Sequence, residues 1–358
     1  MLAIAISDIL RIYPAIRWVM AYSYLALRPN RNVMVSYYAA AGSKNPMHLG
    51  MGVSRKKEYD VLFTSDRLDD VYNKSETIHI DEHSQYVFIS DVHRGDNSVS
   101  DEFAQNRLVY YHALQYYYDD GFTYVEVGDG DEMWEVANYR YIASAHPGVF
   151  GELRKFQKDG RLVMLAGNHN HQILNHDYVS RYMEYDYDGF LDETVEVLPG
   201  LKPREGIILV YDPTGQEILV CHGHEGEILN DYLAPVGMLT NRYIWRFIHR
   251  AGFKYSANPT KNRYKPARRE KSLKKWIEDN GVMMICGHTH RPRLPQAGEI
   301  PYFNCGCVMH PRGMTCLELA FGEISLVRWT IHSRKDGMLY VKRTTMKGPV
   351  NITDFKKD

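Results

Sequence analysis

Residues 85–93 read QYVFISDVH, a short apolar segment that ends in Asp91 and, two positions later, His93. The same event recurs along the chain: a short apolar run is followed at once by residues that bind metals or protons. The further runs and their polar ends are Phe122–Val127 with Gly128-Asp129, Arg161–Ala166 with Gly167-Asn168-His169, Glu217–Cys221 with His222, and Val282–Cys286 with Gly287-His288-Thr289-His290. This recurrence predicts buried strands with chemically active residues at their carboxyl ends.

Helical spacing separates several of these runs. It is clearest in Glu102–Tyr118, Gly151–Lys158 and Lys271–Asp279. Strands that alternate with helices are typical of an α/β fold, in which binding sites form outside the carboxyl ends of the strands. The turn Asp212-Pro213-Thr214-Gly215 predicts a hairpin between Gly206–Tyr211 and Glu217–Cys221. After Met314 the pattern favours an antiparallel meander.

The polar residues at the strand ends form a consistent set of metal ligands. They are Asp91, His93, Asp129, Asn168, His222, His288 and His290. Alternate residues of an extended segment point the same way, so the two members of Asp-x-His or His-x-His can reach one centre. Seven ligands exceed what one tetrahedral zinc needs and suit two metals that share the carboxylate of Asp129.

Composition narrows the class of protein. The chain has 358 residues, of which 44% are hydrophobic, so it can bury a large core and is neither disordered nor a disulfide scaffold. Its 43 Lys and Arg nearly balance 44 Asp and Glu, which excludes attraction of nucleic acid by the whole surface. The five cysteines suggest a reducing compartment, and we expect a cytoplasmic location.

Some segments differ from the average composition of the chain. Residues 177–196 are acidic, and residues 254–275 are basic and suited to gripping an anionic substrate. No stretch of about 20 apolar residues predicts a transmembrane helix. Residues 15–27 fit an amphipathic helix, which packs on the protein or, alternatively, makes peripheral membrane contact.

The five clusters in this order resemble the calcineurin-like metallophosphoesterase family, whose pattern is DxH, GD, GNH, a lone His and GHxH. The resemblance spans roughly residues 85–335. It implies a four-layer α/β sandwich of two mixed sheets flanked by helices. The stretch GDGDEMW (128–134) looks like the GDxxDxW of bacterial UDP-2,3-diacylglucosamine pyrophosphatase-like members, with Glu132 in place of the usual second Asp.

The resemblance also assigns roles by position. It implies one metal held by Asp91, His93, Asp129 and His290, and a second held by Asp129, Asn168, His222 and His288. His169 is implied as the catalytic histidine that protonates the leaving oxygen or stabilises the phosphate. The family usually has an acid after GNH, where this chain has Asn170, so either another carboxylate replaces it, with Asp131 as a candidate, or His169 works without a charged partner. Arg94 is a further candidate for neutralising the phosphoryl oxygens.

The sequence therefore predicts a two-metal phosphoesterase that hydrolyses a phosphate ester or pyrophosphate bond through a metal-bridging hydroxide. Mn²⁺ is the first candidate ion, with Fe and Zn as alternatives. The expected substrate is a phosphorylated small molecule or a nucleotide-linked compound, without a stable nucleic acid partner. Protein phosphatase, phosphodiesterase and nuclease activity remain alternatives, as does a non-catalytic scaffold of the same fold.

We expect three regions along the chain. Residues 1–80 would be an irregular N-terminal extension without an assigned role. Residues 81–335 would form the metallophosphoesterase domain, with a helical insertion near 226–280. Residues 336–358 would add a strand and a tail.

Overall fold

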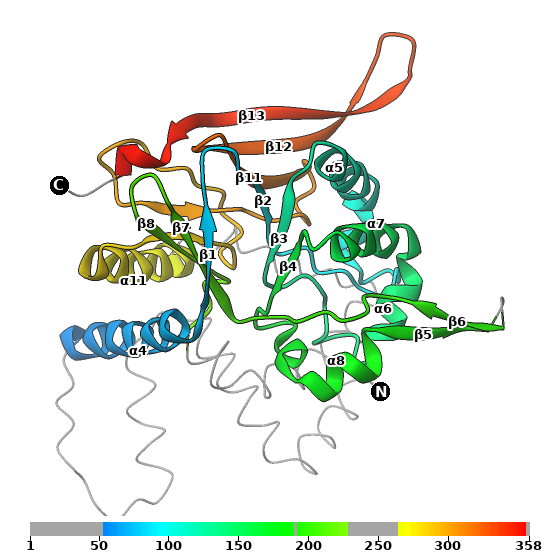
Figure 1. Cartoon of the computed structure of the whole chain (residues 1–358), viewed down its shortest axis with the longest axis horizontal. Coiled ribbons are helices and arrows are strands. Elements are labelled where there is room, and N and C mark those ends of the chain that lie inside the picture. The colour runs from blue at the N-terminus through cyan, green and yellow to red at the C-terminus, as the bar shows by residue number, and fades with distance from the viewer. Residues whose placement is uncertain (1–52, 190–191, 228–263, 356–358) are drawn as a thin grey trace, which may run out of the picture. The chain divides into compact units, whose positions relative to one another are not determined.

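The computed structural model describes residues 53–189, 192–227 and 264–355. The chain divides into two units, residues 1–59 and 60–358, and both large sheets belong to the second unit (Figure 1).

The first sheet has six strands in the order β13-β12-β11-β2-β3-β4. Their bounds are β2 (Gln85–Ile89), β3 (Thr123–Val127), β4 (Leu162–Leu165), β11 (Met314–Ala320), β12 (Glu323–Ser333) and β13 (Leu339–Asn351). β2, β3 and β4 run parallel, so their carboxyl ends lie at one edge of the sheet. β11 joins β2 antiparallel, and β12 and β13 continue the antiparallel half.

The second sheet has five strands in the order β1-β7-β8-β9-β10. Their bounds are β1 (Glu76–Ile80), β7 (Gly206–Tyr211), β8 (Gln216–Cys221), β9 (Met283–Cys286) and β10 (Tyr302–Asn304). β8 and β9 run parallel, so His222 and His288 follow the same end of neighbouring strands. A separate two-stranded sheet consists of β5 (Tyr185–Asp188) and β6 (Glu193–Glu196).

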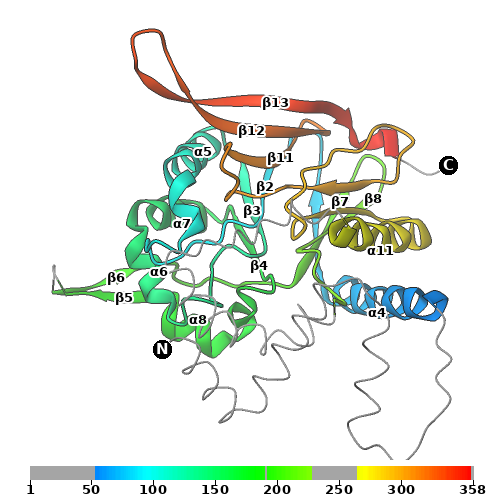
Figure 2. The same ribbon diagram turned by 180° about the vertical axis from the view of Figure 1, so that it is seen from behind.

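Helices cover the outer faces of the two large sheets (Figure 2). The helices are α4 (Val53–Lys74), α5 (Arg107–Asp119), α6 (Tyr139–Ala145), α7 (Pro147–Lys158), α8 (His176–Tyr182) and α11 (Tyr264–Asn280), with 3-10 helices η1 (Glu102–Asn106), η2 (His171–Leu174) and η6 (Ile352–Phe355). Helices α5 and α7 pack on the six-stranded sheet, while α4 and α11 pack on the five-stranded sheet. The molecule is a four-layer α/β sandwich, which confirms the predicted fold class.

The alternation of side chains along β2 explains the layering. Val87 and Ile89 join the apolar cluster under α5 and α7, whereas Phe88 points into the cluster between the sheets. All three side chains are fully buried. A strand buried on both faces needs a continuous apolar run, because successive residues point to opposite faces.

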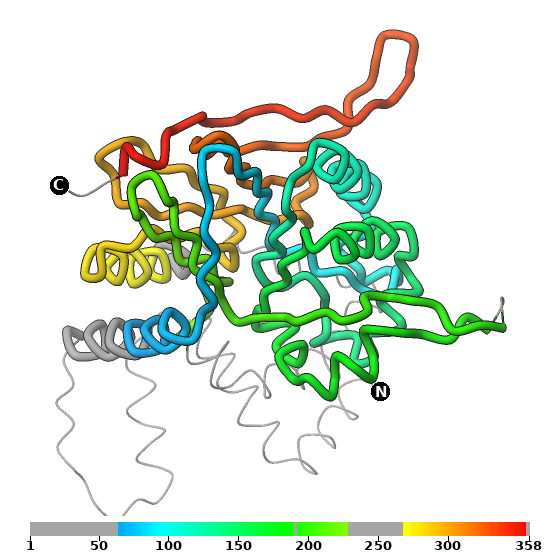
Figure 3. Tube along the Cα trace, in the orientation of Figure 1, coloured from blue at the N-terminus to red at the C-terminus, as the bar shows by residue number. Residues whose placement is uncertain are grey.

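Most predicted elements are confirmed, and the differences concern polar segments. The runs predicted as β2, β3, β4, β7, β8, β9, β11 and β12 are strands. The expectation of irregular structure across residues 1–80 is wrong for residues 53–80, because α4 packs on the five-stranded sheet and β1 pairs in parallel with β7 (Figure 3). The strand expected after residue 336 is β13, which pairs antiparallel with β12. The domain boundaries themselves stay a prediction.

Two expectations fall partly or wholly outside the described residues. The amphipathic helix over 15–27 lies outside them, and so do residues 228–263 of the helical insertion and the first half of the basic block. Among the helices that the structure does describe, none combines the length and apolarity required to cross a membrane.

The burial of side chains in the layer between the sheets can be tested with one substitution. Phe88→Ala removes a fully buried ring and should lower the free energy of unfolding by about 3–5 kcal/mol. Leu108→Ala on α5 is the control, because Leu108 is 67% exposed and its loss should change stability by less than about 0.5 kcal/mol. Urea denaturation followed by tryptophan fluorescence measures both. Equal effects would contradict the described burial.

Candidate metal centre

Six of the seven predicted ligands, all except Asn168, meet in two groups of side chains, and a third group joins His93 to two residues that were not predicted as ligands. The groups are Asp91 with His93 and His290, Asp129 with His222 and His288, and His93 with Glu132 and His169. Within each group, one ligand atom per residue lies within 4.8 Å of the others. The ligands follow β2 and β3 of one sheet and β8 and β9 of the other, so the site forms where both sheets end.

Asp129 connects the first two groups. Its Oδ2 atom lies 3.1 Å from Nε2 of His222 and 3.8 Å from Nε2 of His93. Nε2 of His290 lies 2.9 Å from Oδ1 of Asp91. One carboxylate oxygen that faces an imidazole of each group has the position of a bridging ligand.

The hydrogen bonds of His222 fix its ring. Its Nδ1 atom lies 2.9 Å from the carbonyl oxygen of Val127, which can only accept, so Nδ1 carries the proton. In the neutral ring, Nε2 then presents a lone pair toward Asp129. Two facing lone pairs repel each other unless a proton or a metal cation lies between them.

Several ligand atoms are buried without a hydrogen bond among the described residues. Nε2 of His93 and Oδ1 of Asn168 form none at all with these residues, whereas Oδ1 of Asp91 and Nε2 of His222 have only the imidazole–carboxylate contacts given above, at 2.9 and 3.1 Å. A buried polar atom without a partner is costly, about 1–3 kcal/mol each. These carboxylate, amide and imidazole atoms are suitable donors for Mn, Fe or Zn, so the residues present fit a pair of divalent cations.

The pKa values of the buried carboxylates and histidines at the site depend on one another. Burial would raise the pKa of Asp91 and Asp129, but the charges of nearby histidines outweigh burial and hold both values below normal. Burial would lower the pKa of His222 and His290, but Asp129 raises the first to about 9 and Asp91 raises the second to about 10. Divalent ions would compete with these protons for the same imidazoles.

The backbone of the ligands is unusual. Asp91, His93, Asp129, His288 and His290 all have φ between 51° and 61°. The left-handed region costs an ordinary L-residue about 1–2 kcal/mol. They make up five of the eight non-glycine residues with positive φ in the described part of the chain. Such strain concentrates at functional sites, where surrounding structure enforces it.

Glycines allow the ligand segments to approach one another. A β-carbon on Gly128, which has φ 74°, would lie 2.4 Å from Nδ1 of His222. One on Gly287 would lie 1.7 Å from the Ser90 hydroxyl, and one on Gly167 would lie 2.2 Å from Oδ1 of Asp129. Larger residues would therefore separate the segments that hold Asp91, Asp129 and His222.

His169 is oriented by Glu132 and by the ring of Trp134. Its Nδ1 lies 2.9 Å from Oε1 of Glu132, and Oε2 of the same carboxylate lies 2.8 Å from Nδ1 of His93. The ring of Trp134 stacks on that of His169, with 4.2 Å between the ring centroids. Its indole N–H donates a hydrogen bond to the carbonyl of Asn168. Glu132 is thus a site residue that the sequence-based prediction missed, although it occupies the second acidic position of the GDxxDxW stretch.

Glu132 carries its negative charge at neutral pH. Burial would raise its pKa, but the charge and hydrogen bond of His169, aided by those of His93, lower the pKa to about 2. A carboxylate on Nδ1 fixes the tautomer of His169 and leaves Nε2 for proton transfer. Asn170 instead accepts a hydrogen bond from the amide of Gly167, at 2.6 Å.

Arg94 and Asp131 do not occupy the predicted positions. The Arg94 side chain is fully buried and forms paired hydrogen bonds with Glu126, at 2.6 and 2.8 Å, and with Asp131, at 2.8 and 3.0 Å. Burial opposes its charge, but the two carboxylates raise the pKa of Arg94 well above normal. Its guanidinium is therefore turned into the protein, and Asp131 contacts it rather than His169.

The Arg94 cluster positions the loops that carry the ligands. The backbone amide of His93 donates to the carbonyl of Asp129, and that of Glu132 donates to the carbonyl of Arg94, both at 2.9 Å. A β-carbon on Gly130 would lie 1.8 Å from Oε1 of Glu126. These contacts fix the loop after β2 against the loop after β3.

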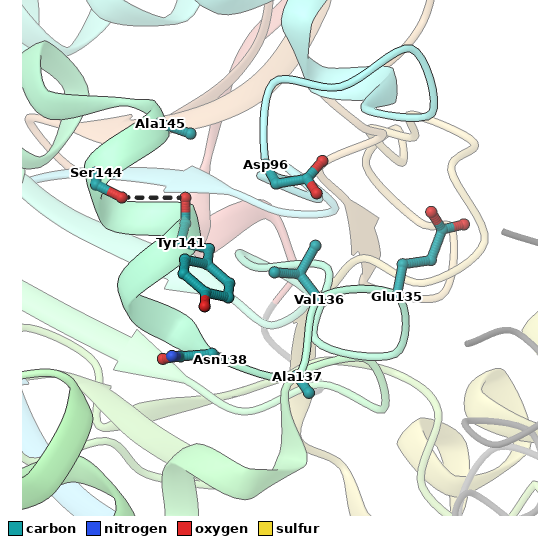
Figure 4. A pocket seen from close by; sticks show the side chains of 8 residues that line it. All are labelled: Asp96, Glu135, Val136, Ala137, Asn138, Tyr141, Ser144 and Ala145. Carbon is teal, nitrogen blue, oxygen red and sulfur yellow. Dashed lines mark hydrogen bonds between the residues drawn. The ribbon is translucent and has the colours of Figure 1, made fainter. Parts of the chain in front are cut away.

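A pocket of about 610 Å³ is built from the same two loops (Figure 4). Asp96 follows His93 by three residues, and Glu135 follows Glu132 by three. The remaining lining comes from the end of that loop and from α6: Val136, Ala137, Asn138, Tyr141, Ser144 and Ala145. Its carboxylates, amide and hydroxyl could receive a polar part of a ligand held at the metal centre.

Comparison with known proteins gives only a distant structural similarity. No protein-family model and no curated protein matches the chain. The solved structure of vacuolar protein sorting 29 from Cryptosporidium parvum is similar over 74% of this chain and 98% of that chain, with 13% sequence identity and a TM-score of 0.32. At this TM-score and identity, function must be argued from the residues themselves.

The buried Arg94 cluster predicts a large stability effect. Arg94→Met leaves the carboxylates of Glu126 and Asp131 buried without a cation and should lower the free energy of unfolding by about 3–5 kcal/mol. The triple variant Arg94→Met, Glu126→Gln and Asp131→Asn should regain part of this loss, because it removes both charges. Chemical denaturation of the three proteins tests this. A triple variant less stable than Arg94→Met would contradict the ion-pair account.

Proposed function

We propose that the chain is a two-metal phosphoesterase of the calcineurin-like metallophosphoesterase type, which hydrolyses a phosphate ester or pyrophosphate bond. One observation carries the proposal: two groups of buried acidic and imidazole ligands share the carboxylate of Asp129. Two cations held at such a site would supply positive charge for a phosphoryl group and would lower the pKa of water.

The residues divide between the two ions. Asp91, His93 and His290 would hold one ion, and His222, Asn168 and His288 would hold the other, with Asp129 between them. Nε2 of His288 also lies 3.2 Å from Oε2 of Glu227, which would orient the ring or add a carboxylate at that ion. Mn²⁺ is the first ion to test.

His169 is the proton donor in this proposal. Glu132 accepts a hydrogen bond from Nδ1 of His169, and stacking on Trp134 limits the tilt of the imidazole ring. The His169 side chain is 19% exposed, so an entering ligand can reach it. A proton on Nε2 can pass to the leaving oxygen as its bond to phosphorus breaks. Glu132 stabilises the protonated imidazole before that transfer.

The substrate is proposed by class only. The pocket lined by Asp96, Glu135 and residues within 136–145 is built from the loops that also carry His93 and Glu132, and we assign it to the alcohol or nucleotide portion of a phosphorylated small molecule. Cleavage of UDP-2,3-diacylglucosamine is a hypothesis that rests on the GDGDEMW stretch alone. A panel of monoesters, diesters and nucleotide sugars separates these substrates.

Metal content gives the first test. Protein stripped by chelator and reloaded with Mn²⁺ should bind two ions per chain, measured by elemental analysis after gel filtration. Asp129→Ala should lose both ions and all activity toward p-nitrophenyl phosphate or its bis-ester. His290→Ala should weaken only one ion. Two tightly bound ions in Asp129→Ala would exclude the shared ligand, and a native chain without stoichiometric metal would favour a scaffold.

Proton transfer gives the second test. His169→Ala should bind the same amount of Mn²⁺ and lose about 10²–10⁴-fold in kcat, because proton donation is removed. Glu132→Gln should retain metal and lower kcat by about 10-fold or more, because the tautomer of His169 is no longer fixed by a charge.

The matched control is His176→Ala. His176 is an exposed histidine at the start of α8, so its loss should leave kcat unchanged. A substrate with a good leaving group, such as a nitrophenyl ester, should suffer less from His169→Ala than an alkyl ester. Equal losses on both substrates would contradict proton donation to the leaving oxygen.

A further inference from the structure

The β12–β13 hairpin extends beyond its sheet. β11 pairs with β12 only as far as Trp329, and β12 and β13 continue as a two-stranded ribbon, which both views show running past β11 (Figures 1 and 2). We call residues 330–347 the basic ribbon. It contains five Lys or Arg and one acid: Arg334, Lys335, Lys342, Arg343, Lys347 and Asp336.

The basic ribbon also exposes apolar side chains. Ile331, Met338, Leu339 and Met346 are 45–71% exposed. β13 is the end strand of its sheet, so in the described part of the chain its outer backbone groups pair with no other strand. A long exposed edge with apolar residues is a site where another strand can add.

The β5–β6 hairpin has the opposite charge. We call residues 184–196 the acidic ribbon: it contains six acids and no Lys or Arg. Asp186 pairs with Arg140 at 3.3 Å and Glu196 with Lys158 at 2.5 Å, and the ribbon itself contributes no Lys or Arg to balance its acids. Tyr185 and Tyr187 are 46% and 60% exposed.

The acidic ribbon is a two-stranded sheet that has little support from other strands. Among the described residues, β5 and β6 pair only with each other. A two-stranded sheet is marginally stable in water unless something packs against it. Among the strands that the structure describes, none occupies either outer edge of the acidic ribbon, so we assign these edges to a strand of complementary charge.

The charges select between possible strand partners. Arg343 is already paired with Glu318, but two copies of β13 side by side would bring Lys342 and Lys347 of one chain close to the same two cations of the other, and like charges across strands are destabilising. The acidic ribbon would instead oppose these cations with carboxylates. Every copy of the chain carries both ribbons, so a second copy supplies the complement without any other protein.

We propose that the chain self-associates, with the acidic ribbon of one copy adding to the β13 edge of the basic ribbon of a second copy. Main-chain hydrogen bonds along the shared edge and burial of the exposed tyrosines against the apolar side chains of the basic ribbon provide the affinity. The opposite charges set the pairing and its register.

Charge reversal tests the proposal on the full chain. The acidic variant is Glu184→Lys with Glu193→Lys, and the basic variant is Lys342→Glu with Lys347→Glu. Light scattering with gel filtration over a concentration series should show self-association of the native chain that weakens in about 0.5 M salt. Each variant alone should associate at least about 10-fold more weakly. An equimolar mixture of the two variants should associate again, because opposite charges then face each other.

Two matched controls carry the same charge changes at exposed positions off both ribbons. They are Glu82→Lys with Asp119→Lys, and Lys202→Glu with Lys271→Glu, and both should associate like the native chain. A native chain that stays monomeric at all concentrations in low salt overturns the proposal. So does association that neither ribbon variant weakens. Binding of the monomer to anionic phospholipid vesicles, lost only in the basic variant, would assign the basic ribbon to a membrane surface instead.

Discussion

The burial of a carboxylate between imidazoles is the constraint on which the rest of the site depends. Asp129 is almost completely removed from water, and its Oδ2 atom faces histidines that come from both sheets. A negative charge in such a position is tolerated only when positive charge is close to it. The glycines at 128, 167 and 287, which let the ligand segments approach each other, serve this one requirement.

A second buried charge cluster supports the first without taking part in it. Arg94 lies directly after a ligand and Asp131 directly before Glu132, yet both side chains turn away from the metal centre and bind each other. Neighbouring residues of the same two loops thus have separate tasks. His93, Asp129 and Glu132 face the site, while Arg94, Glu126 and Asp131 lock the loops together inside the protein.

Sequence reasoning predicted the fold and the side chains that meet at the strand ends because both depend on simple repeated patterns. Apolar runs marked the central strands, and parallel strands bring the residues at their ends to one edge. β1, β5 and β6 escaped prediction because segments such as ETIHI and YDYD lack an apolar run and are fixed by their neighbours. Asp131 was chosen over Glu132 because no pattern tells which of two adjacent acids turns toward His169. The burial of Arg94 depends on tertiary contacts with Glu126, which lies 32 residues away.

The left-handed backbone at five of the ligands has a consequence for how this site could change during evolution. Glycine or asparagine would relieve the conformational cost at those positions, so a descendant that no longer needed the ions would gain folding stability by losing its aspartates and histidines. The chain therefore keeps aspartate and histidine at all five positions at a cost in folding stability.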